Sequence, residues 1–258
     1  MRPPHKTFTQ QHRPKKNLLI GSISAVITAM KNGEQLERIY LQNTISSPEA
    51  DELKQVALEF EVPVNKVPFE KIRNFNLENP KGCIAVKSKI KYQNLQDVIS
   101  LVVENGEIPL LLMLDGITDI RNIGAIARTA YCCGVHAIVI PEKGVGALNE
   151  DAIGTSAGAL EIIPVCRVKS LHNAIDEMHL NGIKVFVSEM TATENIFNID
   201  LKEPCAVIMG SEDKGVQPSL YNVCDDRFKI PMRKDFESLN VSVAAGMILY
   251  EAMKQRME

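Results

Sequence analysis

A run of six apolar residues, 109–114, constrains the fold of this chain more than any other feature. Such a continuous run is typical of a strand that is buried on both faces, as the strands of parallel sheets are. Further strand candidates lie at residues 137–140, 162–165, 184–187, 206–209 and 228–230, with helix candidates between them at 122–133, 171–180, 218–224 and 241–257. Strands that alternate with helices predict an α/β fold in which helices cover both faces of a parallel sheet.

The sequence before this run predicts a separate small domain. Residues 1–16 are basic and interrupted by prolines, which is typical of a disordered tail. Residues 17–91 alternate short apolar runs with helical patterns and predict a small α/β domain. Residues 92–107 are amphipathic and end in Asn-Gly, and we interpret them as a linker to a second domain at residues 108–258.

Composition excludes several classes of protein. The 258 residues are 45% hydrophobic and 24% charged, which suits a globular protein with two cores. No apolar run reaches membrane-spanning length, and the first residues lack an apolar signal segment, so we expect a cytoplasmic protein. The six cysteines include no C-x-x-C pair and predict reduced core residues. The histidines show no ligand spacing, so no metal is predicted.

Three segments of the second domain each follow a predicted strand, at the edge where open α/β sheets bind ligands. Taken singly, their asparagines are typical of helix caps, their glycines of turns and Arg128 of an ion pair, while Glu212 suits an ordinary loop carboxylate. The residues that stand out are Asn122, Gly124 and Arg128, then Gly210, Glu212 and Gly215, and last Ile230, Ser238, Leu239 and Asn240.

In this order, the three segments resemble the motifs of the SpoU (TrmH-like) family of RNA ribose 2′-O-methyltransferases, in the SPOUT superfamily. The matching pieces are N-x-G-A-x-x-R-T-A from Asn122, G-x-E-x-x-G from Gly210, and Ile230-Pro231 followed by S-L-N-V-S-V-A from Ser238. The resemblance extends over nearly the whole chain. It is closest to the guanosine methyltransferases that act on 23S rRNA.

The resemblance implies transfer of a methyl group from S-adenosylmethionine to a ribose 2′-hydroxyl, that of a guanosine in 23S rRNA. It implies a C-terminal trefoil knot, although chain logic alone disfavours knots. It implies cofactor contacts by Gly210, Ile230 and Leu239. The catalytic and RNA-facing residues that it implies are Asn122, Arg128, Glu212, Ser238 and Asn240.

The role of Arg128 stays open between several kinds of chemistry. The family implies that this arginine acts on the ribose hydroxyl as a base, yet a guanidinium stays protonated at ordinary pH. Arg128 can instead stabilise the developing alkoxide or clamp a neighbouring phosphate.

The apolar helix predicted at residues 241–257 is expected to be buried on most faces. Family resemblance favours a homodimer that buries this helix at its interface. The alternative is a core helix of a monomer.

The first domain is expected to bind the RNA. Lys87 and Lys89 alternate with Lys91, so on one strand they would share a face and follow a phosphate backbone. The alternative is an edge strand whose lysines discourage aggregation. Small tRNA-specific members of the family commonly lack a separate N-terminal domain, so residues 17–91 favour rRNA. Two alternatives stay open: a tRNA 2′-O-methyltransferase, and a catalytically silent protein that binds RNA or the ribosome.

One further pattern points to a different enzyme class. Residues 154–158 read G-x-S-x-G, the nucleophile elbow of α/β-hydrolases. That elbow needs a strand before it and, later in the sequence, an acid and then a histidine. Residues 149–152 do not read as a strand, and the later histidines, His172 and His179, come too soon. We expect a turn or helix of small residues that packs close to the three motifs.

Overall fold

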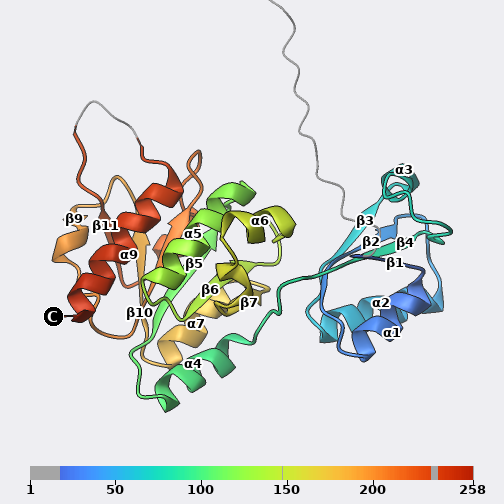
Figure 1. The fold of residues 1–258 in the computed structure, drawn as a ribbon, viewed down its shortest axis with the longest axis horizontal. Helices are drawn as coiled ribbons and strands as arrows, with labels where there is room; N and C mark the ends of the chain where they lie inside the picture. Colours follow the sequence, from blue (N-terminus) through green and yellow to red (C-terminus); the bar gives the residue numbers. More distant parts are fainter. Residues whose placement is uncertain (1–17, 147, 234–237, 258) are drawn as a thin grey trace, which may run out of the picture. The chain divides into compact units, whose positions relative to one another are not determined.

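A computed structural model describes residues 18–146, 148–233 and 238–257 of the chain. The described residues divide into two compact units, a first that ends at Lys87 and a second that begins at Ser88 (Figure 1). The break falls between Lys87 and Ser88, and the sequence pattern predicts the end of the first domain at residue 91.

The first unit is a four-stranded sheet in the order β1-β4-β2-β3. β2 pairs with β3 in parallel and with β4 antiparallel, and β1 also runs antiparallel to β4. Figure 1 shows α1 and α2 together on one side of this sheet and α3 on the other. The elements are β1 (Leu19–Gly21), α1 (Ile23–Lys31), β2 (Leu36–Gln42), α2 (Pro48–Glu59), β3 (Val64–Val67), α3 (Phe69–Arg73) and β4 (Cys83–Lys87).

Local sequence explains where the two longer helices of this unit begin. Ser47 accepts a hydrogen bond from the backbone N–H of Ala50, and Pro48 occupies the first turn of α2. Ser22 accepts from the backbone N–H of Ala25 at the start of α1. Both helices therefore start at a serine whose side chain satisfies a free backbone N–H group.

The second unit contains a seven-stranded sheet in the order β7-β6-β5-β10-β8-β11-β9, and every pairing in it is parallel. This confirms the predicted α/β class. Its strands are β5 (Leu110–Asp115), β6 (Ala137–Pro141), β7 (Val165–Val168), β8 (Lys184–Ser188), β9 (Glu194–Asn195), β10 (Cys205–Gly210) and β11 (Asp226–Lys229). Its helices are α4 (Leu95–Glu104), α5 (Ile120–Cys132), α6 (Glu150–Thr155), α7 (Leu171–Leu180), α8 (Pro218–Tyr221) and α9 (Val241–Met257).

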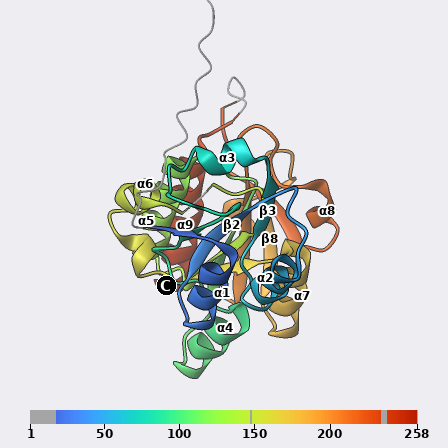
Figure 2. The ribbon, with the colours of Figure 1, turned by 90° about the vertical axis from the view of Figure 1, so that its right-hand side faces the viewer.

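The central strand β5 explains the apolar run that opens the second domain. Every residue of β5 is buried. Leu110, Leu112 and Leu114 pack into the core that α5 and α9 cover, and Leu111 and Met113 pack into the core that α4 and α7 cover. Alternate side chains therefore enter two different cores, which is why the run contains no polar residue. Figure 2 shows the ribbon of Figure 1 turned by 90°.

Three sequence expectations about this unit need correction. The predicted linker is helix α4, whose Leu95, Val98 and Ile99 are buried in the second unit's core. β7 begins at Val165 rather than at residue 162, because residues 159–161 form a turn of 3₁₀ helix. β9 was not predicted, since two residues carry too little pattern to recognise.

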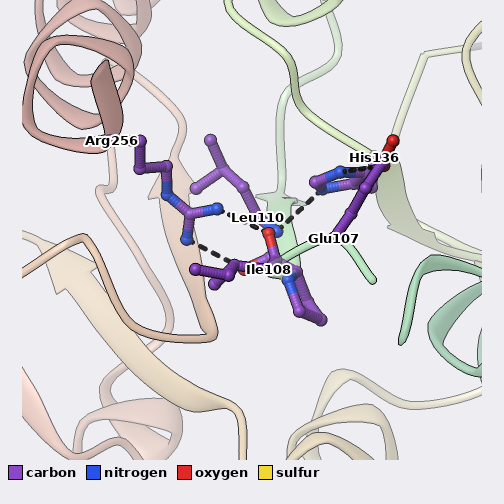
Figure 3. A network of polar contacts seen from close by, with 6 residues as sticks. Glu107, Ile108, Leu110, His136 and Arg256 are labelled. Carbon is purple, nitrogen blue, oxygen red and sulfur yellow. Dashed lines mark hydrogen bonds and ion pairs between the residues drawn. The ribbon is translucent and has the colours of Figure 1, made fainter. Parts of the chain in front are cut away.

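A polar network fastens the end of α9 to the start of the sheet (Figure 3). The Arg256 guanidinium donates to the carbonyl oxygens of Ile108 (2.6 Å), Pro109 (2.9 Å), Leu201 (2.8 Å) and Glu203 (2.9 Å). One side chain thus satisfies carbonyl groups at the beginning of β5 and before β10.

His136 lies on the other side of the same strand start (Figure 3). Its Nδ1 accepts the backbone N–H of Leu110 at 3.0 Å, and its Nε2 lies 2.9 Å from Glu107 Oε2. Because Nδ1 accepts a hydrogen bond, Nε2 is the protonated ring nitrogen and its N–H donates to Glu107 Oε2. His136 thus has a structural role at the residue before β6.

The cysteines are all free, but they are not all in the core. Cys83, Cys166 and Cys205 are buried as predicted, and burial raises the pKa of the Cys83 and Cys166 thiols to about 12. Cys132 is exposed on α5, so for this residue the prediction of a core position is wrong. Among the described residues, no helix is both long and apolar enough to cross a membrane.

Candidate functional site

The three motif segments meet at the carboxyl edge of the central strands. β5 and β10 are neighbours in register, with Asp115 opposite Gly210. The first segment begins α5 after β5, the second is the loop after β10, and the third leads into α9. Helices α5 and α9 pack side by side on one face of the sheet (Figure 1). Residues far apart in sequence are thereby brought to one place.

Hydrogen bonds join one polar side chain from each segment. Glu212 Oε1 accepts from Asn122 Nδ2 at 3.1 Å and from Asn240 Nδ2 at 2.6 Å. Asn240 Nδ2 also lies 3.1 Å from Asn122 Oδ1. We refer to Asn122, Glu212 and Asn240 as the polar triad; it contains three of the five residues predicted to be catalytic.

The polar triad also fixes the start of α9. Glu212 Oε1 accepts the backbone N–H of Val241 at 3.1 Å, and Asn240 Oδ1 accepts the backbone N–H of Ser242 at 3.0 Å. A carboxylate beside a helix N-terminus is favoured by the free amide groups and by the helix dipole. Asn240 therefore caps the helix, as the sequence predicts, while Glu212 connects that helix to the loop after β10.

Gly210 is required by the path of the loop that follows it. A Cβ atom at Gly210 would lie 2.0 Å from the carbonyl carbon of Gly215 and 2.2 Å from the backbone nitrogen of Val216. The loop folds back because the Gly215 N–H donates to the Ser211 carbonyl at 2.8 Å, and Gly215 has a φ of +65°. Both glycines of the second motif thus shape the loop that carries Glu212.

Asp115 and Gln217 hold the other end of this loop, and sequence reasoning missed both. Asp115 Oδ2 accepts the Gln217 backbone N–H at 2.7 Å, and Oδ1 accepts the Gln217 Nε2 at 2.7 Å. Asp115 is only 2% exposed, so both carboxylate oxygens are satisfied within the protein. The signal that was available is a carboxylate at the end of a wholly apolar strand.

The first motif packs closely on α6. A Cβ at Gly124 would lie 2.7 Å from the carbonyl oxygen of Ala152 and 2.7 Å from Thr155 Cβ. The G-x-S-x-G pattern falls at the end of α6 rather than after a strand. Ser156 is fully buried, and its Oγ donates to the Ile153 carbonyl at 2.7 Å. The pattern is therefore a packing element beside the first motif, as expected, and not a nucleophile elbow.

Of the residues predicted to be catalytic or to bind the cofactor, five lie outside the polar triad. Arg128 is exposed on α5, and within the described part of the chain no hydrogen bond or ion pair involves its side chain. Ser238 is exposed. Ile230 and Leu239 are half-buried, and Ile230 packs against the core under α5 and α9. Cofactor contacts by Gly210, Ile230 and Leu239 stay a prediction, as do catalytic roles for Arg128 and Ser238.

The two lysines predicted to bind RNA are each paired with a carboxylate. Lys87 Nζ lies 2.5 Å from Glu34 Oε2, and Lys89 Nζ lies 2.8 Å from Glu150 Oε1. The expectation that they share a strand face is wrong, because β4 ends at Lys87. Their contact with RNA stays a prediction.

Comparison with known proteins identifies the family. Residues 109–250 match the SpoU rRNA Methylase family. The chain belongs to this family. A curated relative from Bacillus subtilis, the putative TrmH family tRNA/rRNA methyltransferase YacO, is 33% identical over 96% of this chain and 98% of its own length. The 23S rRNA (guanosine-2′-O-)-methyltransferase RlmB of Vibrio parahaemolyticus is 37% identical over 69% of this chain and 72% of its own length.

Solved structures share the SpoU fold. An AdoMet-bound rRNA methyltransferase from Sinorhizobium meliloti has a TM-score of 0.57 at 21% identity and covers 92% of this chain, which spans 87% of that protein. The SpoU methyltransferase AviRb from Streptomyces viridochromogenes has a TM-score of 0.56 at 22% identity. The match covers 93% of this chain and 90% of AviRb. The family and fold predicted from the three motifs are confirmed. The trefoil knot stays a prediction.

Proposed function

We propose that this protein transfers a methyl group from S-adenosylmethionine to the 2′-hydroxyl of a guanosine ribose in 23S rRNA. The observation that carries the proposal is the polar triad, which unites the three SpoU segments at the carboxyl edge of β5 and β10. The RlmB relative from Vibrio parahaemolyticus supports the choice of 23S rRNA and guanosine. An enzyme with this substrate works where ribosomes are made, in the cytoplasm.

The loops after β10 and β11 suit the cofactor chemically. S-adenosylmethionine supplies an electrophilic methyl group. Ile230 and Leu239 are half-buried apolar side chains that can enclose an adenine ring, and the backbone around Gly210 can offer N–H and C=O groups to its edge. These three residues would hold the cofactor.

Arg128 and the polar triad have different tasks in this proposal. Glu212 Oε1 already accepts three N–H groups, so this oxygen positions the loop and α9 rather than taking a proton. Arg128 is exposed and carries a permanent charge that can stabilise a developing alkoxide or hold a neighbouring phosphate. Alignment of the hydroxyl and removal of water supply the rest of the rate enhancement.

The substrate is tested by methylation with radiolabelled S-adenosylmethionine. The protein is incubated with 23S rRNA and, separately, with bulk tRNA from a strain that lacks its gene. We expect label in 23S rRNA at a guanosine whose phosphodiester resists alkali, since a methylated 2′-oxygen cannot attack the phosphate. Label in tRNA alone would favour the tRNA alternative, which the name of the Bacillus subtilis relative keeps open. Absence of both label and cofactor binding would indicate a silent RNA-binding protein.

The proposal divides the work between the two units. Residues 17–91 bind the RNA and select the target, and residues 108–258 carry out the chemistry. All three motifs lie in the second unit, which supports this division.

A homodimer through α9 is part of the proposal. The apolar side chains that α9 leaves exposed form one stripe, spaced by four, three and seven residues: Val243 (48% exposed), Met247 (47%), Tyr250 (60%) and Met257 (80%). Side chains at this spacing lie on one helix face. An apolar stripe of this kind marks an interaction surface, and a second copy of the chain fits it because the stripe can pair with itself.

We expect the wild-type protein to sediment as a dimer at micromolar concentration and a Met247→Glu/Tyr250→Glu variant to sediment as a monomer. Two charges would otherwise be buried without partners in the interface. The control is Leu180→Glu, since Leu180 is 89% exposed at the end of α7 and lies off this stripe. A monomeric wild type, or a variant that remains dimeric, would rule out this interface.

A further inference from the structure

The sheet of the first unit has two unlike faces. One face packs Ile39 and Leu41 of β2 against α1 and α2 in a well-filled core. The opposite face is covered by α3, which has five residues, and by the loop after it. Among the described residues, the buried side chains of this second face are Leu19, Val67, Ile72 and Ile84, with Tyr40, Phe75, Leu77 and Val86 partly buried against them. We refer to the face packed against α1 and α2 as the helix face and to the face under α3 as the open face.

Tyr40 lies near the centre of the open face. It belongs to β2, which lies between β4 and β3, and its neighbours in register are Ile84 and Asn65. Its ring is half-buried and lies 5.0 Å from the ring of Phe75, with 44° between the planes. Lys71 Nζ lies 5.5 Å from the Tyr40 ring centroid. A half-exposed aromatic pair thus sits beside a cation.

Arg38 adds a second cation to the open face. It precedes Tyr40 by two residues on the same strand, and it pairs in register with Val86, which packs on this face. Within the described residues, the side chains of Arg38 and Lys71 make no hydrogen bond or ion pair with a carboxylate. Their charges are therefore available to an anion.

The helix face has the opposite character. Residues 22–35 and 47–62, which contain α1 and α2, hold six carboxylates and two lysines. Both lysines are paired, Lys31 with Glu52 and Lys54 with Asp51. The hydrogen bond and charge of Lys54 hold the pKa of the Asp51 carboxyl below its ordinary value, with a smaller contribution from Lys66. A polyanion would meet an acidic surface here.

The loop beside the open face is held in an uncommon backbone conformation. Asn76, Asn79 and Lys81 have φ values of 52°, 49° and 43°, in the left-handed region that side chains other than glycine rarely adopt. Such local strain persists only where the surrounding structure imposes it, and it concentrates at binding sites. The loop also brings Lys81, a further exposed cation, to the end of the chain segment that covers the open face.

We propose that the open face binds an unpaired nucleotide of the substrate RNA, with its base stacked against Tyr40 and its phosphates held by Arg38 and Lys71. This rests on the proposed function in one respect, that the substrate is RNA. Aromatic side chains on a sheet stack bases that are free of a duplex, whereas a paired RNA helix presents phosphates and ribose hydroxyls instead. The combination of rings and cations therefore fits single-stranded RNA better than duplex RNA.

The test measures binding of the full chain to two probes by fluorescence anisotropy: a labelled hairpin RNA with an unpaired loop, and a blunt RNA duplex of the same length. Tyr40→Leu keeps an apolar side chain in the sheet and removes the ring, while Tyr40→Phe keeps the ring. We expect Tyr40→Leu to weaken hairpin binding about tenfold and Tyr40→Phe to stay within about twofold of the wild type, as loss of one stacked base implies. The affinity for the duplex should be unchanged in both variants.

Charge is tested with a matched pair of double variants. Arg38→Gln/Lys71→Gln removes two cations from the open face, and Lys31→Gln/Lys54→Gln removes two from the helix face. The first should lower the salt dependence of hairpin binding by a slope of about two, and the second should leave it unchanged.

Three outcomes would overturn the proposal: wild-type hairpin affinity in a Tyr40→Leu variant with an unchanged melting temperature, equal losses on hairpin and duplex, or equal effects of the two double variants. Calorimetry with S-adenosylmethionine runs in parallel on the same proteins. If the wild type binds the hairpin through Tyr40 but not the cofactor, the proposed function fails and this binding site stands.

Discussion

Gly210→Ala is expected to abolish cofactor binding and to lower methyl transfer by at least about a hundredfold, because a displacement of about 1 Å in a catalytic site costs that much. The added methyl group would lie 2.0–2.2 Å from backbone atoms of Gly215 and Val216, where no flexible side chain can move away. The loop must shift as a whole. Glu212 moves with it, and the hydrogen bonds of the polar triad are lost.

The measurement is calorimetric titration with S-adenosylmethionine, together with the initial rate of 23S rRNA methylation. Gly154→Ala is the control, since a Cβ at Gly154 in α6 meets nothing within 4 Å. Alanine is also a better helix former than glycine, so this variant should be as stable as the wild type or more so. If a folded Gly210→Ala protein binds the cofactor with unchanged affinity, the loop after β10 does not form the cofactor site.

Much of the fold of the second unit could be predicted because its buried strands consist of apolar residues. The residues of β5 alternate between two cores, and both cores demand apolar side chains. Helices α5 and α7 follow from amphipathic patterns with a capping residue or a polar start. The prediction of a linker was wrong because α4 has the amphipathic pattern of any surface helix, and no local feature of its sequence indicates which unit it packs against.

The site was predictable as a set of residues but not as a geometry. The motif match names Asn122, Glu212 and Asn240, yet only the fold shows that one carboxylate oxygen joins them and the start of α9. Asp115 escaped notice because its function depends on Gln217, which is 102 residues away in the chain. Contacts of this range leave no periodic trace in a single sequence.

The alternating lysines near residue 89 show that sequence periodicity alone does not establish a shared strand face. Lys87 and Lys89 alternate in sequence, but the strand ends before the alternation is realised, and each ammonium group finds a carboxylate. The open face of the first unit has no comparable sequence signature. The two cations proposed to hold phosphates lie on different elements, Arg38 on β2 and Lys71 on α3, and only the folded sheet places both beside Tyr40.

Arg128→Ala is expected to lower the methylation rate by about a hundredfold to a thousandfold, the cost of removing one donor that stabilises charge in a transition state. Cofactor binding should not change. The reason lies in the surroundings of Arg128: the side chain is exposed on α5 and, within the described residues, forms no hydrogen bond or ion pair that the fold would lose. The melting temperature should therefore match that of the wild type.

Arg121→Ala serves as the matched control, because Arg121 is an exposed arginine on the first turn of the same helix and lies outside the predicted site residues. It should retain the wild-type rate with 23S rRNA. Any loss that it does show measures the general effect of one positive charge on RNA attraction, and this loss should shrink at high salt.

Arg128→Lys separates charge from geometry. Lysine keeps the charge but lacks the planar fork that engages an oxyanion or a phosphate at two points, so we expect it to restore little of the rate. The measurement is kcat with saturating S-adenosylmethionine and 23S rRNA, with KM for the RNA determined in parallel. A loss confined to kcat assigns Arg128 to the developing alkoxide, whereas a rise confined to KM assigns it to a phosphate of the bound RNA. A lysine variant with wild-type kcat and KM would contradict both roles, since each requires the guanidinium.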